Sequence, residues 1–428
     1  MSLAYFYIFL FLMAAGAPIV FALMIGPGLS ILIDGQGQYF QALLTRLYNG
    51  MDSFPLLAVP FFILAGELMN SGGITAAIVR FCQSLVGHVR GGLAHVNVLS
   101  SMLFSGISGS AVADASAIGK MLIPAMERDG YRRDFAAGVT AAAAVMGPII
   151  PPSGLMILYG FVMNVSVGAL FAGGIVPGIL VALGLMAMTA LLARRYDLPK
   201  AAAKATWRER GQAFKGAYLA LLAPVILLGG LLSGIFTATE SAAVAALYGL
   251  VVALFITRSL KPAQLPRVFI NVAVQSGVIL LLVGAAVMFA WLITVSGMAS
   301  AIASALTGVT TNVYLLLFLV NLFLFVVGMF LDAGPAILIL GPILGPIFAA
   351  MGVDPVHFAV LMCVNLSIGL ATPPMGLVLF VVASVSGERI ERIALAMAPY
   401  LLVLVGVLFL ITYVPAITLT APRLMGLL

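Results

Sequence analysis

Charged residues are scarce in this chain. Only 8% of its 428 residues are Asp, Glu, Lys or Arg, whereas 63% are hydrophobic, and the mean hydropathy is +1.21. A soluble domain carries about 25% charged residues. The composition therefore excludes a soluble globular domain and indicates a polytopic membrane protein.

Cysteine and histidine are also rare. The two cysteines, Cys82 and Cys363, both lie in apolar stretches, so the sequence implies no disulfide framework and no metal-binding motif. The three histidines are scattered, and no nucleophile and base stand at catalytic spacing. Nothing resembles a phosphate-binding loop, which argues against ATP hydrolysis. We therefore expect no enzymatic activity and no organic cofactor.

Long apolar runs are what the chain has instead. A membrane-spanning helix needs roughly 20 apolar residues, whereas the strands of a β-barrel alternate over segments of about ten residues. The runs are residues 166–193, 217–236, 238–257, 268–295 and 394–417. Their length and continuity predict an all-α protein.

The net charge of +6 comes from basic residues in two short segments, so it does not indicate nucleic-acid binding. The positive-inside rule places both segments in the cytoplasm. Two of the predicted spans, 217–236 and 238–257, lie between the two segments. An even number of spans returns the chain to the same side of the membrane, as two cytoplasmic segments require. The basic residues are Arg194, Arg195, Lys200, Lys204, Arg208, Arg210 and Lys215 in the first segment, and Arg258, Lys261 and Arg267 in the second.

The N-terminal residues lack the basic region and cleavage site of a signal peptide. We expect them to form a retained first span that is interrupted near Gly16–Pro18.

A Pro-Pro pair occurs twice within apolar sequence, at Pro151-Pro152 and at Pro373-Pro374, 222 positions apart. Proline removes a backbone donor and clashes with the preceding turn, so each pair should interrupt a helix. In a bilayer such a break is tolerated only where protein or a water-filled cavity satisfies the freed backbone groups. Paired breaks in corresponding halves of a membrane chain indicate the site of a secondary transporter.

The same offset relates further residues, which predicts a full internal repeat. The matching pairs are Gly106 and Gly328, Gly119 and Gly341, Pro124 and Pro346, Gly147 and Gly369, and Gly154 and Gly376. Gly-rich turns at 105–110 and 328–334 are expected to be tips of re-entrant hairpins. Identity alone does not distinguish parallel from inverted repeats, but the broken-helix pattern favours inverted ones.

The predicted organisation has four parts. Residues 1–50 form an N-terminal scaffold segment. Residues 51–193 form repeat 1, with its tip at 105–110 and its broken helix at 147–154. Residues 194–267 hold a basic loop, a scaffold helical hairpin and a second basic loop, and 268–428 form repeat 2 with the tip 328–334, the break 369–376 and a C-terminal helix.

The two tips are candidate cation sites. Ser105, Ser108 and Ser110 offer hydroxyl oxygens beside glycines whose carbonyls can turn inward; alternatively, these small residues only allow close helix packing. Asp332, near Gly328, is an ionisable residue in an apolar region and so a functional candidate, although it could also cap the following helix. Asp114 and Lys120 could form an ion pair or lie near the membrane interface, and a structural role is the simpler interpretation.

The breaks carry a second set of candidates. Thr372 precedes one Pro-Pro pair and Ser153 follows the other, so their hydroxyls, with unwound carbonyls such as that of Pro152, could contact Na⁺ or substrate. The alternative is that each hydroxyl only covers a freed backbone group. Asn365 lies closest to the second break and is either a substrate contact or, like Asn321, an interhelical hydrogen-bonding group. Thr237 and Glu240 form the pattern of a helix capping box.

Taken in order, the motifs resemble the large membrane subunit of tripartite ATP-independent periplasmic (TRAP) transporters, within the ion-transporter superfamily. The similarity covers nearly the whole chain, and the order and spacing of its motifs make it specific. The motifs include Pro60-Phe-Phe-Ile-Leu-Ala-Gly-Glu-Leu-Met69, Phe104-Ser-Gly-Ile-Ser-Gly-Ser110, Ile150-Pro-Pro-Ser153, Leu170-Phe-Ala-Gly-Gly174, Thr237-Ala-Thr-Glu240 and Gly369-Leu-Ala-Thr-Pro-Pro-Met-Gly376.

The resemblance implies a multi-pass protein of the bacterial inner membrane that imports small organic acids, such as dicarboxylates or sialic acid, together with Na⁺. Its implied partners are a periplasmic substrate-binding protein and a small four-helix membrane subunit, expected here as a separate chain. It implies an elevator-type movement and two or more Na⁺ ions. Ser105 and Ser108 would serve one site, and Gly369, Thr372 and Met375, with Gly328 close by, would serve the other. A stand-alone Na⁺/organic-anion symporter of the same superfamily is the alternative.

Overall fold

The computed structural model describes residues 3–71, 73–200, 203–298 and 312–428, with residues 301, 302, 304, 308 and 310 between the last two ranges. In this part of the chain the secondary structure is helical, apart from an isolated bridge between Arg90 and Lys200. Seven of the described helices are long and apolar enough to cross a bilayer, and one bent helix pair would make an eighth. The predicted all-α polytopic membrane fold is confirmed.

The helices of the first half are α1 (Ala4–Ala14), α2 (Ile19–Ile33), α3 (Phe40–Met51), α4 (Ala58–Ser71), α5 (Ile74–Val86), α6 (Gly92–Ser108), α7 (Ala111–Arg128), α8 (Arg133–Ala144), α9 (Gly154–Met163) and α10 (Val167–Arg195). Those of the second half are α11 (Trp207–Leu232), α12 (Ala238–Val251), α13 (Leu265–Val295), α15 (Val313–Phe330), α16 (Ala333–Ala350), α17 (Pro355–Gly369), α18 (Leu377–Ser386), α19 (Ile390–Tyr413) and α20 (Ala416–Leu424).

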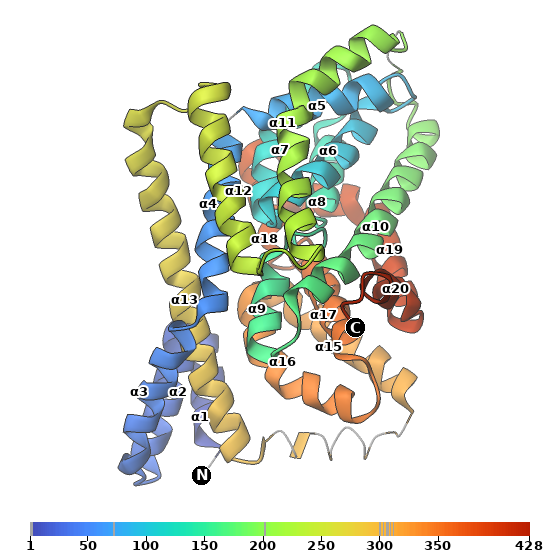
Figure 1. Ribbon diagram of the computed structural model, residues 1–428. Helices are drawn as coiled ribbons and strands as arrows, with labels where there is room; N and C mark the ends of the chain where they lie inside the picture. Colours follow the sequence, from blue (N-terminus) through green and yellow to red (C-terminus); the bar gives the residue numbers. More distant parts are fainter. Residues whose placement is uncertain are drawn as a thin grey trace.

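Four of the long apolar runs form helices close to their predicted bounds, namely α10, α12, α13 and α19. The fifth helix, α11, begins at Trp207, ten residues before the predicted run, so the last basic residues of the predicted loop lie in the helix. α12 continues through a π-helical turn, Val252–Ile256, and starts with the predicted capping box of Thr237 and Glu240. Figure 1 shows both basic segments, before α11 and between α12 and α13, at the same upper end of the molecule. This agrees with the predicted parity of two helices between them.

The N-terminal prediction needs a correction. The chain is interrupted at residues 15–18, but α1 and α2 do not continue as one span; they pack against each other as a helical hairpin. Gly26 makes the close approach possible, because a Cβ there would lie 2.8 Å from the carbonyl oxygen of Tyr5. At 11 and 15 residues, each helix is shorter than the roughly 20 residues that a span requires.

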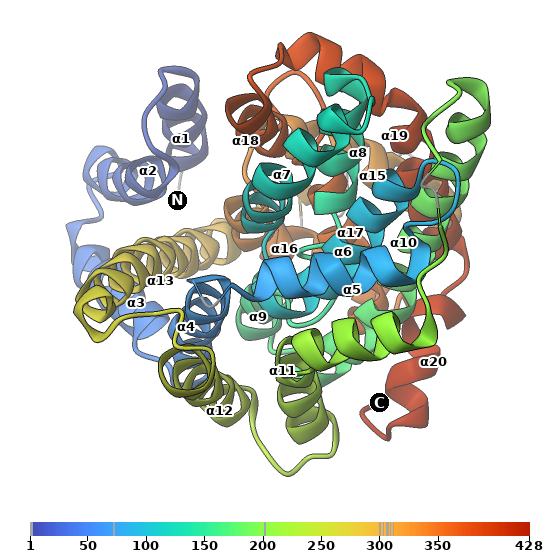
Figure 2. The same ribbon diagram turned by 90° about the horizontal axis from the view of Figure 1, so that it is seen from above.

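Two groups of helices meet along one interface, and α5, α10, α11 and α20 belong to neither group. We call α1–α4, α12 and α13 the frame, and α6–α9 with α15–α19 the inner bundle. Figures 1 and 2 show the frame on one side of the molecule and the inner bundle on the other. The frame helices α4 and α13 contact α6, α9 and α16 of the inner bundle.

Inside the bundle, the two interrupted segments exchange partners. α8 and α9 flank the first Pro-Pro break, and α17 and α18 flank the second. α7 packs on α8 but also on α18, whereas α16 packs on α17 but also on α9. In Figure 1, α8 and α18 lie in the upper half, and α9 and α17 lie below them. In each half of the chain, the helix that follows the break therefore packs against the hairpin of the other half: α9 against α16, and α18 against α7.

Close glycine packing joins α3 to α13 in the frame. A Cβ on Gly284 would lie 2.7 Å from the carbonyl oxygen of Leu47, and one on Gly50 would lie 2.9 Å from Cα of Gly284. Small residues commonly permit such approach between membrane helices.

We predict that Gly284→Ala lowers the free energy of unfolding by about 1–3 kcal/mol, because the added methyl group overlaps backbone that cannot rotate away. Gly277→Ala on the same helix is the matched control, since a Cβ there meets no atom within 4 Å. Melting temperatures of the two purified variants in detergent measure the difference. Equal melting temperatures would contradict the close packing.

Candidate functional site

A cavity of about 280 Å³ lies where the frame meets the inner bundle. It is lined by both hairpin tips, by both Pro-Pro breaks and by the frame helices α4 and α13. Of the predicted site residues, Ser108, Ser110, Pro152 and Asp332 line it directly. Segments from both halves of the chain therefore converge on one cavity.

The first tip is narrower than the predicted 105–110, because α6 continues to Ser108 and α7 begins at Ala111. Gly109 makes the turn with φ +61°, a conformation that glycine adopts without steric cost. Ser110 caps α7 by accepting a hydrogen bond from the backbone N–H of Ala113 at 3.4 Å. A Cβ on Gly109 would lie 2.6 Å from the carbonyl oxygen of Pro152, so the tip rests directly on the first break.

Asp114 is a buried residue beside the first tip whose contacts the sequence interpretation missed. Its side chain is completely buried. The Ser105 hydroxyl donates to its Oδ2 at 2.5 Å, and the Ser108 hydroxyl donates to its Oδ1. Lys120 is exposed and forms no ion pair with it among the described residues, so the ion pair that the sequence left possible is not formed.

A symmetry about the tip could have identified this contact. Ser105 lies as many positions before the turn at Gly109–Ser110 as Asp114 lies after it. In an antiparallel helical hairpin such positions are at the same height and can face each other. A carboxylate that matches a serine across a predicted tip is therefore a usable signal.

At the first break, Ser153 satisfies backbone groups. Its hydroxyl donates to the carbonyl oxygen of Pro148 at 2.5 Å and accepts from the N–H of Met156 at 3.3 Å, which caps α9. Pro152 lies beside it on the cavity wall. The Pro-Pro bonds of both breaks are cis. In this conformation Ser153 acts as the break's own hydrogen-bonding partner, which is the alternative that the sequence left open.

The second tip contains only Leu331 and Asp332 between α15 and α16. Asp332 caps α16 by accepting from the N–H of Ala333 at 2.8 Å, which confirms the predicted cap, and it also lines the cavity. Gly328 lies in the last turn of α15 against the end of α17. A Cβ on Gly369 would lie only 2.6 Å from the carbonyl carbon of Gly328.

The remaining candidates at the second break lie off the cavity wall. Thr372 is buried and donates to the carbonyl oxygen of Ile368 at 2.8 Å, whereas Met375 is half-exposed. Asn365 donates to the backbone oxygen of Asn321 at 2.9 Å and to its side-chain oxygen at 2.8 Å. Asn321 in turn donates to Thr412 at 3.0 Å. The structure thus places Asn365 in an interhelical polar chain behind the break.

Helix ends dominate the electrostatics of the cavity. Four helices begin at its wall, namely α7, α9, α16 and α18, whereas α6 and α17 end beside it. Helix N-termini attract anions through free N–H groups and the helix dipole. Carbonyl groups at helix C-termini are hard oxygen ligands suited to small cations. None of the described lining residues is lysine or arginine, and Asp332 is the one acidic residue among them.

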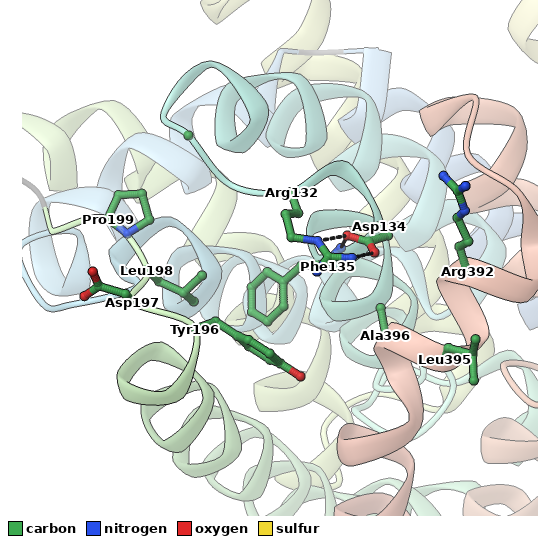
Figure 3. A pocket seen from close by; sticks show the side chains of 11 residues that line it. Arg132, Asp134, Phe135, Tyr196, Asp197, Leu198, Pro199, Arg392, Leu395 and Ala396 are labelled. Atoms are coloured by element: carbon green, nitrogen blue, oxygen red, sulfur yellow. Dashed lines mark hydrogen bonds and ion pairs between the residues drawn. The ribbon is translucent and has the colours of Figure 1, made fainter.

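A larger crevice of about 570 Å³ lies away from both breaks, among the start of α8, the end of α10 and the start of α19 (Figure 3). Its two arginines already have acidic partners. Arg132 contacts Asp134 through two hydrogen bonds of 3.1 and 2.5 Å, and Arg392 lies 3.5 Å from Glu388. Because its charges are compensated and it contains none of the predicted site residues, we do not assign the site to it.

Comparison with known proteins agrees with this geometry. The sequence profile described as "Tripartite ATP-independent periplasmic transporter, DctM component" matches residues 6–417. The chain belongs to this family. As a DctM-family protein it belongs to a family of multi-pass transporter components, and the relatives named below are transporter permeases.

Two relatives and one solved structure illustrate the similarity. The chain is 40% identical to the sialic acid TRAP transporter large permease protein SiaM of Vibrio cholerae, over 96% of each chain. It is 39% identical to the C4-dicarboxylate TRAP transporter large permease protein DctM of Pseudomonas aeruginosa, over 90% of each. The Alcanivorax borkumensis YdaH transporter shares the fold with a TM-score of 0.65 at 18% identity, over 90% of this chain and 89% of that one.

We predict that Gly369→Ala destabilises this DctM-family protein by about 1–3 kcal/mol, because the new methyl group would overlap the backbone of Gly328. Gly406→Ala on α19 is the control, as a Cβ there meets nothing within 4 Å. Thermal unfolding in detergent distinguishes them. A Gly369→Ala protein as stable as the control would rule out close contact between the second tip and the second break.

Proposed function

We propose that this chain is the translocating membrane subunit of a Na⁺-coupled secondary importer of small organic acids, which a periplasmic binding protein delivers. The observation that carries the proposal is the convergence of four helix N-termini and two helix C-termini on one cavity. Half-helix N-termini suit the carboxylate of a substrate, and unwound or terminal carbonyls suit Na⁺.

The residues present fit Na⁺ as a co-transported ion. Na⁺ is a hard cation that prefers oxygen ligands. Ser105 and Ser108 offer hydroxyl oxygens on the first tip, with Ser110 next to them. At the second break, Thr372 donates its single proton to Ile368, which leaves its lone pairs free. Backbone oxygens of Gly328, Gly369 and Met375, with Asp332 nearby, would complete a second site, so two or more ions are expected.

The substrate class follows from the wall of the cavity and from the relatives. The names of the two relatives specify sialic acid and C4-dicarboxylates, both of which carry carboxylate groups. A cavity of about 280 Å³ suits a small molecule of this kind. We infer that Pro152, Ser153 and Thr372 belong to its surroundings, whereas Asn365 supports the break from behind through Asn321.

For the transport step, we propose an elevator-type movement of the inner bundle against the frame. The cavity lies between the two groups, with Phe62 of α4 and Gln275 of α13 on the frame side. Sliding of the bundle would carry the tips and breaks past these frame helices. The exchange of partners between the halves supports an inverted repeat, which would provide equivalent outward- and inward-facing arrangements.

The proposed partners are a small four-helix membrane subunit and a periplasmic substrate-binding protein, and the proposed location is a bacterial inner membrane. The outer face of the frame suits a helical membrane partner or lipid, because Ile270, Val274 and Val278 of α13 are exposed and apolar. The Na⁺ gradient supplies enough energy. Each Na⁺ ion that crosses 100 mV yields about 2.3 kcal/mol, and a tenfold Na⁺ gradient adds about 1.4 kcal/mol per ion. Two ions therefore yield about 7 kcal/mol, which exceeds the cost of about 2.7 kcal/mol for a hundredfold accumulation of solute even after the charge of a monoanion is subtracted.

We predict that Thr372→Ala raises the Na⁺ concentration for half-maximal uptake about tenfold, which corresponds to about 1.4 kcal/mol for one lost oxygen ligand. Thr372→Ser keeps the hydroxyl and is the matched control. The assay is uptake into proteoliposomes that contain both membrane subunits, with the binding protein added and Na⁺ varied at constant ionic strength. Wild-type Na⁺ dependence in Thr372→Ala would remove this residue from the proposed site.

A second measurement separates the importer from a stand-alone symporter. We expect no concentrative uptake when the binding protein is omitted, because the substrate must be delivered to the cavity. Uptake by this chain at a comparable rate without any binding protein would favour the stand-alone symporter.

A further inference from the structure

Asp114 is an unusual residue within the first hairpin. Of the acidic residues in the described part of the chain, it alone is fully buried. It lies in the first turn of α7, where the helix dipole offsets a negative charge by typically 0.3–1 kcal/mol, up to about 2 in partly buried sites. Burial of a carboxylate without a positive partner costs considerably more than this.

No basic side chain supplies the missing charge among the described residues. None of the ion pairs in that part of the chain includes Asp114. Lys120 follows it by six positions on α7, which is about 240° around a helix, and is exposed. The immediate partners of Asp114 are two neutral hydroxyl groups, from Ser105 and Ser108.

The two serines are held in a defined orientation by these contacts. A serine hydroxyl has one proton and two lone pairs. Oγ of Ser105 lies 2.7 Å from the carbonyl oxygen of Ser101 and 2.5 Å from Oδ2 of Asp114. Its one proton goes to the carboxylate, since charge-assisted hydrogen bonds are the stronger ones. Ser108 likewise donates to Oδ1, and its oxygen also accepts from the backbone N–H of Ser110 at 3.4 Å, so each serine oxygen retains at least one lone pair that can accept.

We propose that Asp114 is a positioning residue for Na⁺, which rests on the function proposed above. The carboxylate accepts the protons of Ser105 and Ser108, turns their lone pairs toward the ion, and provides the negative charge that the ion compensates. It thus acts through the two serines. Partners of this kind, one step behind the ligands, typically change metal affinity 10–100-fold when they are removed.

The internal repeat supports treatment of the three residues as one unit. At the offset of 222 positions, Ser105 corresponds to Val327, Ser108 to Phe330 and Asp114 to Ala336. The second hairpin lacks both hydroxyls and the carboxylate together. By contrast, Ser110 corresponds to Asp332, and both cap the helix that follows the tip. A hairpin of this shape therefore forms without the carboxylate, and the carboxylate occurs only in the hairpin that also has the two serines.

The test is Asp114→Asn, which keeps the shape of the side chain and removes its charge. The first readout is thermal stabilisation of the purified protein by NaCl, with choline chloride keeping the ionic strength constant. The second is the Na⁺ dependence of uptake in proteoliposomes. We expect the Na⁺ half-saturation to rise 10–100-fold in both. Asp134→Asn, the same change in an exposed ion pair on α8, should behave as wild type.

A double-mutant cycle tests whether Asp114 acts through its serine. In a Ser108→Ala background, Asp114→Asn should shift the Na⁺ half-saturation by less than it does alone, because one of its two targets is missing. Additive effects would contradict the proposed role.

Asp114→Glu retains the charge and should recover part of the Na⁺ affinity that Asp114→Asn loses. If the Asn variant does not fold, an unchanged half-saturation in Asp114→Glu overturns the proposal, because the carboxylate has moved by one methylene.

The outcomes separate the inference from the function on which it rests. A wild-type protein that responds to Na⁺, combined with an equal response in Asp114→Asn, overturns the role of Asp114 alone. A wild-type protein that neither gains stability with Na⁺ nor depends on Na⁺ for uptake overturns Na⁺ coupling, and the role of Asp114 with it.

Discussion

The structure depends on one constraint, which is that a backbone interruption inside a membrane protein must find its hydrogen-bonding partners within the protein. Ser153 supplies such partners at the first break, and the Thr372 hydroxyl donates to the carbonyl oxygen of Ile368 at the second. Both breaks also pack closely against a helical hairpin. Gly109 rests on Pro152 at the first break, and Gly328 rests on Gly369 at the second. Because glycine has no side chain, backbone can lie against backbone at both places. The cavity forms where these contacts leave polar groups directed inward.

For the proposed function, this arrangement would let a site with few charged side chains bind both an anion and a cation. Interrupted helices provide N–H groups at some ends and carbonyl groups at others, so the backbone itself presents both signs of partial charge. Such dipoles are held by packing and need no reorganisation when an ion binds. Asp114 is the exception on the first tip, and its two serine partners convert its buried charge into an orientation of neutral ligands.

Much of the fold was predictable because hydropathy and helix breaks are local signals. The apolar runs, the position of each Pro-Pro break and the capping roles of Asp332 and Thr237 all follow from residues close together in the chain. The predictions that failed concern how neighbouring segments pack on each other. α1 and α2 turn back on each other instead of forming one span, and the ion pair of Asp114 with Lys120 that the sequence left possible is not formed, because Asp114 faces serines across the tip.

The sequence by itself determined the class of molecule, the approximate bounds of its spans and the two segments that hold the site. Bilayer solvation and proline chemistry act residue by residue, so a pattern suffices for these conclusions. Only the tertiary structure decided which side chains share a space: Ser108, Ser110, Pro152 and Asp332 at the cavity, with Asn365 behind the break. That choice depends on the rotation and packing of helices from both halves, which many weak contacts set together.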